Sequence, residues 1–113
     1  MIHELRLHNN PFEKIKEGSK TIEMRLYDEK RRLINIGDII EFTNRVTLEK
    51  IKVKVIKLHL FNSFEDLYNN FDNLSLGYNI DEIKDFNDMC KYYTTEEQKK
   101  YGVVGIEIKI IKK

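Results

Sequence analysis

The sequence predicts an α+β fold: a small, mostly antiparallel β-barrel with short helices in the connections. Several short segments alternate apolar and polar residues strictly, which is the period of half-buried strands. These segments are joined by turns that are too short for the crossovers of a parallel sheet. The longest segment also shifts its apolar phase midway, as strands do at the β-bulges where barrels bend.

Length and composition fit one domain over residues 1–113. A hydrophobic fraction of 41% with a charged fraction of 35% is typical of a soluble globular protein rather than a disordered chain. The net charge is +1, so contact with nucleic acid would need a local basic patch. Cys90 is the single cysteine, which excludes an internal disulfide, and no leader or long apolar run is present. We therefore expect a cytoplasmic protein without a membrane segment.

The first three elements are a strand, a helix and a second strand. Residues 3–7 alternate and predict a short strand. Asn10 is a suitable N-cap for a helix over residues 11–17, and the proline that follows it suits the first helical position. Gly18 supplies the left-handed residue that ends this helix, and residues 21–26 alternate as the second strand.

Lys20 stands at the start of that second strand and shares the parity of its apolar row, which begins at Ile22. On a continuous strand its amine would point toward the barrel interior or its mouth. Beside Thr21, and near Glu23 and Arg25, such a lysine could hold an anion or polarise a carbonyl. Alternatively the strand begins only after Lys20, which is then a solvated loop residue.

The middle of the chain predicts two more strands. Residues 28–37 carry a run of charges that is expected to form a solvated surface. Strands are predicted over residues 39–43 and 51–61, with a polar chain reversal between them. In the second of these strands the inward apolar positions change from odd to even near Val55 and Ile56, which indicates one inserted residue.

Three helices and a closing strand are predicted for the second half. Ser63 and Asp66 form a capping signature before apolar residues at helical spacing, which we expect to be core rather than a stacking platform. Residues 72–79 are predicted as a loop and residues 94–100 as a short capped helix. A helix over 81–93 would turn inward Ile83, Phe86, Cys90 and Tyr93. A last strand is predicted over 103–111.

The residue pattern offers few chemical groups. The three histidines have no ligand spacing with one another or with Cys90, so neither a metal nor another cofactor is predicted. We find no signature of a serine or cysteine nucleophile and no glycine-rich phosphate loop. The candidates that remain are the group around Lys20 and the carboxylates of the helix over 94–100.

Three motifs occur in a fixed order: GSKTIEMR at residues 18–25, IGDIIEF at residues 36–42 and YGVVGI at residues 101–106. With the Pro-Phe pair that precedes them, they make the chain resemble the ASCH domain family, relatives of PUA domains, over nearly its whole length. The resemblance implies a PUA-like β-barrel with short helices. It also implies a cleft beside the Lys20 strand that binds RNA or nucleotides.

One bacterial branch with a similar overall plan hydrolyses the acyl amide of acetylcytidine. It uses a lysine, a threonine three residues later and a glutamate on the helix before the last strand. Lys20 corresponds to the lysine, whereas Glu23 stands where that branch has threonine. Glu96 or Glu97 could supply the third group, and spacing does not choose between them.

Three hypotheses follow. In the first the protein binds RNA, a nucleotide or a nucleoside, with Lys20 and Arg25 on phosphate and Tyr93 or Tyr101 stacked on a base. The candidate contacts are Lys20, Thr21, Glu23, Arg25, Tyr93 and Tyr101. In the second it hydrolyses a modified nucleoside with Lys20, Glu23 and one of Glu96 or Glu97. In the third Lys20, Glu23 and Arg25 form a structural ion-pair network.

A row of lysines on the longest strand leaves a further choice open. Lys50, Lys52 and Lys54 alternate along it. They either extend a basic surface for nucleic acid or keep an exposed strand face soluble.

Overall fold

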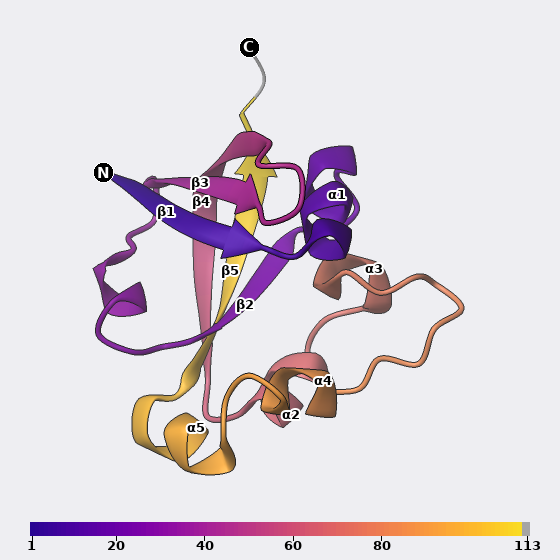
Figure 1. Cartoon of the computed structure of the whole chain (residues 1–113). Helices are drawn as coiled ribbons and strands as arrows, with labels where there is room; N and C mark the ends of the chain where they lie inside the picture. Colours follow the sequence, from indigo (N-terminus) through magenta and orange to yellow (C-terminus); the bar gives the residue numbers. More distant parts are fainter. Residues whose placement is uncertain (112–113) are drawn as a thin grey trace.

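A computed structural model describes residues 1–111 of the chain (Figure 1). Its strands are β1 (Ile2–Leu7), β2 (Ile22–Leu26), β3 (Ile39–Asn44), β4 (Lys50–Phe61) and β5 (Val103–Ile110). The helices are α1 (Asn9–Glu17), the 3-10 turn η1 (Arg31–Leu33), α2 (Phe64–Tyr68), α3 (Asn73–Leu76), α4 (Asn87–Cys90) and α5 (Thr95–Tyr101). None of the described helices has the length and apolar character that a membrane crossing requires.

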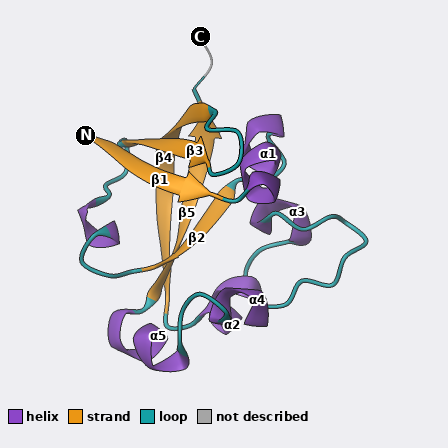
Figure 2. Ribbon diagram, in the orientation of Figure 1, coloured by secondary structure: helices purple, strands orange, loops and turns teal. Residues whose placement is uncertain are grey.

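The strands form one curled sheet in the order β1-β3-β4-β5-β2. Only the β1–β3 pair is parallel, and the other three pairs are antiparallel. Figure 2 shows the sheet wrapped into a half-barrel, with the helices in the connections and below it. The predicted fold class, an α+β fold with a mostly antiparallel PUA-like barrel, is confirmed.

The phase change in β4 is a β-bulge, as predicted. The pairing of β4 with β5 shifts register between Val55 and Lys57. Val53 and Val55 before the bulge are fully buried in the half-barrel, and Phe61 after it packs against a second core. The inserted residue turns the second half of β4, so Val53 and Val55 pack in one core and Phe61 packs against the other.

The two cores lie on opposite faces of β2. One fills the half-barrel and includes Phe12 of α1 and Phe42 of β3. The other lies between β2, β5 and the segment from α2 to α3. The apolar row of β2, which includes Ile22, faces this second core, whereas Glu23 on the other parity is also buried. The expectation that β2 is half-buried is therefore wrong, because the segment from α2 to α3 covers its apolar face and its polar face turns toward the half-barrel.

The predicted helix over residues 81–93 is the main error in the fold. Only Asn87–Cys90 is helical, and Ile83, expected to be inward, is 91% exposed. The side chain of Asp85 accepts hydrogen bonds from the backbone and side chain of Asn87 at 3.0 Å, a turn that competes with helix. The Lys84 ammonium bonds backbone carbonyls at the end of α2, which holds the segment in an irregular path.

Two helix boundaries also differ from the prediction. The predicted loop over 72–79 contains α3, capped by Asp72, whose carboxylate accepts from the Ser75 amide at 2.9 Å. Helix α1 begins at Asn9 rather than after Asn10. The Asn9 side chain accepts a hydrogen bond from the buried Asn44 at 2.9 Å, so a tertiary contact fixes this end. The predicted stop at Gly18 is confirmed, with φ at 93°.

Candidate functional site

A cleft of about 660 Å³ lies beside β2. Its arginines come from β1, β2, η1 and the β3–β4 turn, and its tyrosines come from α2 and the segment between α2 and α5. A second hollow of about 500 Å³ beyond the end of β4 is lined by Leu60, Phe61, Asn62, Asp66, Asn69 and Asn70. That hollow has no cationic side chain in its lining, so we take the cleft beside β2 as the candidate site.

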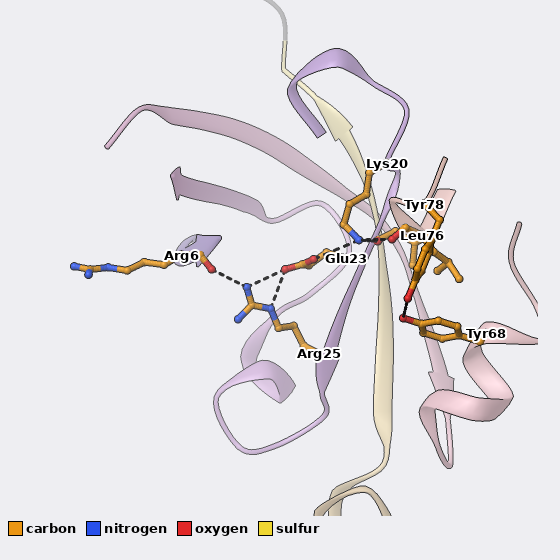
Figure 3. A network of polar contacts seen from close by, with 8 residues as sticks. Arg6, Lys20, Glu23, Arg25, Tyr68, Leu76 and Tyr78 are labelled. Atoms are coloured by element: carbon orange, nitrogen blue, oxygen red, sulfur yellow. Dashed lines mark hydrogen bonds and ion pairs between the residues drawn. The ribbon is translucent and has the colours of Figure 1, made fainter. Parts of the chain in front are cut away.

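The floor of the cleft is a row of charged groups from β2 and the residues before it (Figure 3). The Glu23 carboxylate accepts a hydrogen bond from Arg25 Nε at 2.9 Å through Oε2, and Arg25 Nη2 forms an ion pair with the same oxygen at 2.9 Å. Its other oxygen, Oε1, lies 3.8 Å from Lys20 Nζ. Lys20 Nζ donates to the backbone carbonyls of Ile22 at 2.8 Å and Leu76 at 3.0 Å. The predicted ion-pair network among Lys20, Glu23 and Arg25 is thus present.

Lys20 is brought to this position by the chain reversal after α1. The left-handed Gly18 ends the helix, and the amide of Lys20 bonds the Lys14 carbonyl at 3.1 Å. Strand β2 begins only at Ile22, yet Lys20 is 4% exposed. The interpretation as a solvated loop residue is therefore wrong, although the strand does begin after Lys20. Its ammonium meets the last carbonyl of α3, which has no partner within its own helix.

Burial lowers the pKa of the Lys20 amine from its usual 10.5. The carboxylate of Glu23 opposes this shift, and the positive charge of Arg25 adds to it. Both contacts need only N–H donors, and a neutral amine keeps two N–H groups, so it can still donate to both carbonyls. The site therefore tolerates either protonation state of Lys20 without losing these two contacts.

Arg25 also closes the open side of the half-barrel. Strands β1 and β2 are the two edges of the sheet. The Arg25 guanidinium reaches from one edge to the other and donates through Nη2 to the backbone carbonyl of Arg6 at 3.1 Å. One side chain therefore holds Glu23 and bridges the gap that would otherwise separate the edge strands.

At the other end of the row a chain of hydroxyls is tied to a carboxylate. The Tyr78 hydroxyl lies 3.0 Å from that of Tyr68 and donates to Asp88 Oδ2 at 2.6 Å. Burial and the Asp88 carboxylate raise the pKa of Tyr78 to about 12, and burial also raises that of Tyr68. Both tyrosines are therefore neutral donors at physiological pH.

The structure brings together only part of the predicted site. Lys20, Glu23, Arg25 and Tyr93 line the cleft. The lining that the described residues form does not include the other four predicted site residues: Thr21, Glu96, Glu97 and Tyr101. The Glu97 carboxylate accepts from the Thr94 amide at 2.9 Å and so caps its own helix. Glu96 is exposed, and Tyr101 packs against the second core.

Sequence reasoning missed other residues of the lining. Arg31 lies in the charge run that was expected to be solvated, but it lines the cleft and pairs with Asp28 at 2.8 Å. Among the described residues, its Nε is the one buried side-chain polar atom without a hydrogen-bond partner. Arg45 and Tyr78 also line the cleft. They come from stretches read as a turn and a loop, where no periodicity marks a functional residue.

Within residues 1–111 no three His, Cys, Asp or Glu side chains converge as metal ligands. The chemistry that the cleft offers is therefore that of its arginines, its lysine amine, its carboxylates and its tyrosines.

Comparison with known proteins agrees with this architecture. The ASCH domain family matches residues 5–112. The crystal structure of the hypothetical protein PH0355 is 37% identical, with a TM-score of 0.82, and the match covers 98% of this chain and 100% of that one. The solution structure of PF0455 from Pyrococcus furiosus is 35% identical, with a TM-score of 0.72 and full coverage of both chains.

A more distant structure, a mutant of ZmASCH from Zymomonas mobilis, is 12% identical with a TM-score of 0.68. The match covers 96% of this chain and 67% of that one, and at this identity it shows the fold alone. No protein with a curated description matches. The match to the family over almost the whole sequence, together with two structures above 30% identity, establishes that the chain belongs to the ASCH domain family.

Proposed function

We propose that the protein binds RNA or a nucleotide in the cleft beside β2. The observation that supports this is the combination of arginines and tyrosines in the lining of one open cleft of about 660 Å³. Guanidinium groups pair with phosphate through charge-assisted hydrogen bonds, and aromatic rings stack on unpaired bases. A nearly neutral chain can bind nucleic acid this way because the positive charge is concentrated locally.

Arginines rather than Lys20 supply the phosphate contacts in this proposal. Two of the Lys20 donors are already taken by backbone carbonyls, and Arg25 is held by Glu23. Arg45 is exposed at the cleft and Arg31 has an unpaired Nε among the described residues. For stacking, Tyr92 is 61% exposed in the lining, whereas Tyr93 already stacks on Phe64 at 5.7 Å between ring centroids.

An Arg45→Gln variant tests the phosphate contact. We expect it to bind a short single-stranded RNA several-fold more weakly and to lower the slope of log affinity against log salt by about 0.7, the value for one phosphate contact. Fluorescence anisotropy at several salt concentrations measures both. The matched control is Lys54→Gln on β4, because Lys54 is also exposed but does not line the cleft. Equal weakening in both variants would contradict a site in the cleft.

The lowered pKa of Lys20 favours a second candidate, hydrolysis of an acyl amide on a modified nucleoside. A neutral Lys20 amine that donates to two carbonyls keeps its lone pair free to take a proton from water. The water oxygen would add to the acyl carbon, the C–N bond would break, and the proton would pass to the departing amino group. Glu23 is the carboxylate that lies beside Lys20 for this step, since Glu96 and Glu97 are not in the lining.

This candidate predicts release of acetate from acetylcytidine, with a rate that rises with pH through the pKa of Lys20 because only the neutral amine accepts the proton. Chromatography of the cytidine product measures the rate of this reaction. Absence of turnover by the folded protein would exclude the hydrolase, while binding without turnover would leave the first proposal in place.

A further inference from the structure

The charged and polar groups of the cleft differ between its two ends. In Figure 3 the Arg6 and Arg25 contacts lie at one end of the polar row, Glu23 and Lys20 lie in the middle, and Tyr78 lies at the other end. We propose that the cleft holds one nucleotide unit that carries a terminal phosphate, with this phosphate at the arginine end and the base at the tyrosine end. This inference rests on the proposed binding function and narrows it.

The arginine end is built for an anion. The lining includes four arginines, and all of them come from the first 45 residues: Arg6, Arg25, Arg31 and Arg45. Arg25 is neutralised by Glu23, and Arg31 is paired with Asp28. The amide of Arg45 bonds the carbonyl of Leu7, next to Arg6, so an anion at this end would meet the charge of Arg45. A small shift of Arg31 would also give its unsatisfied Nε an acceptor.

The tyrosine end disfavours a second phosphate. Asp88 lines it and is fixed by the Tyr78 hydroxyl at 2.6 Å. Glu82 lines it as well, and its carboxylate is held by the Asn79 amide at 2.6 Å. Lys91 lies 3.6 Å from Asp88, but that pair is largely exposed to solvent and offsets little of the charge. A strand that continued past this end would bring its next phosphate toward two fixed carboxylates.

A neutral base suits the tyrosine end. The hydroxyls of Tyr68 and Tyr78 are uncharged at physiological pH and are tied to each other and to Asp88 by hydrogen bonds. Glu23 Oε1, which lies beyond hydrogen-bond distance of Lys20 Nζ at 3.8 Å, can accept from an N–H group on the edge of a base. The charge pattern thus matches a ligand that is anionic at one end and a neutral hydrogen-bonding ring at the other.

The size of the cleft agrees with a single unit. Its volume of about 660 Å³ falls within the ~300–1,000 Å³ that sites for one small molecule occupy. Grooves that follow a single strand without sequence preference cover about 4–16 nucleotides for each domain. A terminal nucleotide can be a free nucleoside monophosphate or the end of an RNA strand, and the same contacts would recognise both.

Binding of three probes to the whole protein separates these sources. They are the 5′- and 3′-monophosphates of the four nucleosides, an eight-nucleotide RNA with a phosphate at its end, and the same RNA without it. We expect the best monophosphate to bind within about fivefold of the phosphorylated RNA, and the unphosphorylated RNA to bind at least tenfold more weakly than either. A free nucleotide as the natural ligand predicts that monophosphate binds most tightly, and a strand end predicts that phosphorylated RNA does.

The second part of the test is a variant that should bind RNA more tightly. The double variant Glu82→Gln with Asp88→Asn should bind the unphosphorylated RNA about tenfold better than the wild type, because it removes the repulsion while keeping the side-chain shapes. The control is Asp81→Asn with Glu65→Gln, which changes the net charge equally at exposed positions that do not line the cleft. It should leave this affinity within about twofold.

Three results would overturn the inference, and they are distinguishable from one another. If unphosphorylated RNA binds as tightly as the phosphorylated strand while monophosphates do not bind, the cleft follows a continuous strand, and the proposed RNA-binding function survives without the inference. If neither monophosphates nor either RNA binds, the proposed function fails as well. An equal gain in both double variants would show a general charge effect and would also overturn it.

Discussion

Replacing Lys20 with methionine should lower the free energy of unfolding by about 3 kcal/mol, because it leaves two buried carbonyl acceptors without their donor. These are the carbonyls of Ile22 and Leu76, which Lys20 Nζ meets at 2.8 and 3.0 Å. Methionine keeps most of the apolar volume of the lysine chain, so the loss reports the amine rather than a cavity. Urea unfolding followed by circular dichroism measures it.

The control for this variant is Lys54→Met on the exposed face of β4, which should change stability by less than about 0.5 kcal/mol.

The contribution of Lys20 to stability should also depend on pH. The pKa of Lys20 is lowered in the folded protein, so between that pKa and 10.5 the unfolded chain binds a proton that the folded chain does not. The stability of the wild type relative to Lys20→Met should therefore rise with pH up to about 10.5. A difference that falls over this range would contradict a buried amine with a lowered pKa.

Substitution of Gly77 by alanine should destabilise the protein more than the same substitution at Gly18. Both glycines have left-handed backbones, with φ of 96° and 93°, so each alanine costs about 1–2 kcal/mol for that conformation alone. A Cβ at Gly77 would also lie 3.0 Å from Lys20 Cδ, whereas a Cβ at Gly18 would have no neighbour within 4 Å. The extra loss at Gly77 therefore measures how tightly α3 is packed on Lys20.

Thermal or urea unfolding of the two alanine variants gives this difference directly. A matching experiment places Gly77→Ala in the Lys20→Ala background, where the shortened side chain removes the close contact. There the extra loss should disappear and leave the cost of the backbone conformation alone. Equal losses at the two glycines in the wild-type background would show that Lys20 moves aside freely, and the tight anchoring inferred for it would be wrong.

The sequence predicted the strands better than the segment between α2 and α5. Alternation located all five strands, and the phase change in β4 located the bulge, because both are local consequences of which side chains are buried. The helix predicted over 81–93 failed because Asp85 forms a local turn and Lys84 bonds a distant helix end. Contacts of that second kind are set by tertiary structure and leave no periodic pattern.

The candidate site was predictable to a similar extent. The parity of Lys20 with the apolar row left an inward position and a solvated loop position both open, and the spacing of Glu23 and Arg25 placed both on the opposite parity. Parity alone did not reveal that β2 is covered on both faces, which is why Lys20 and Glu23 are both buried. Tyr78 and Arg45 reach the cleft through long-range folding of irregular segments, so sequence patterns could not assign them to it.

The most direct test of the central claim is a titration of isotope-labelled protein with RNA and with nucleoside monophosphates, followed by backbone amide shifts. If the cleft beside β2 is the binding site, the shifts should concentrate at Lys20, at residues 23–25, at Arg45 and at residues 77–78 and 92–93, which contribute to its floor and walls. Amides of Lys52 and Lys54, on the exposed face of β4, should stay unchanged. Shifts centred on those lysines, with the cleft unaffected, would place the nucleic-acid surface on the outer face of the sheet and contradict the account.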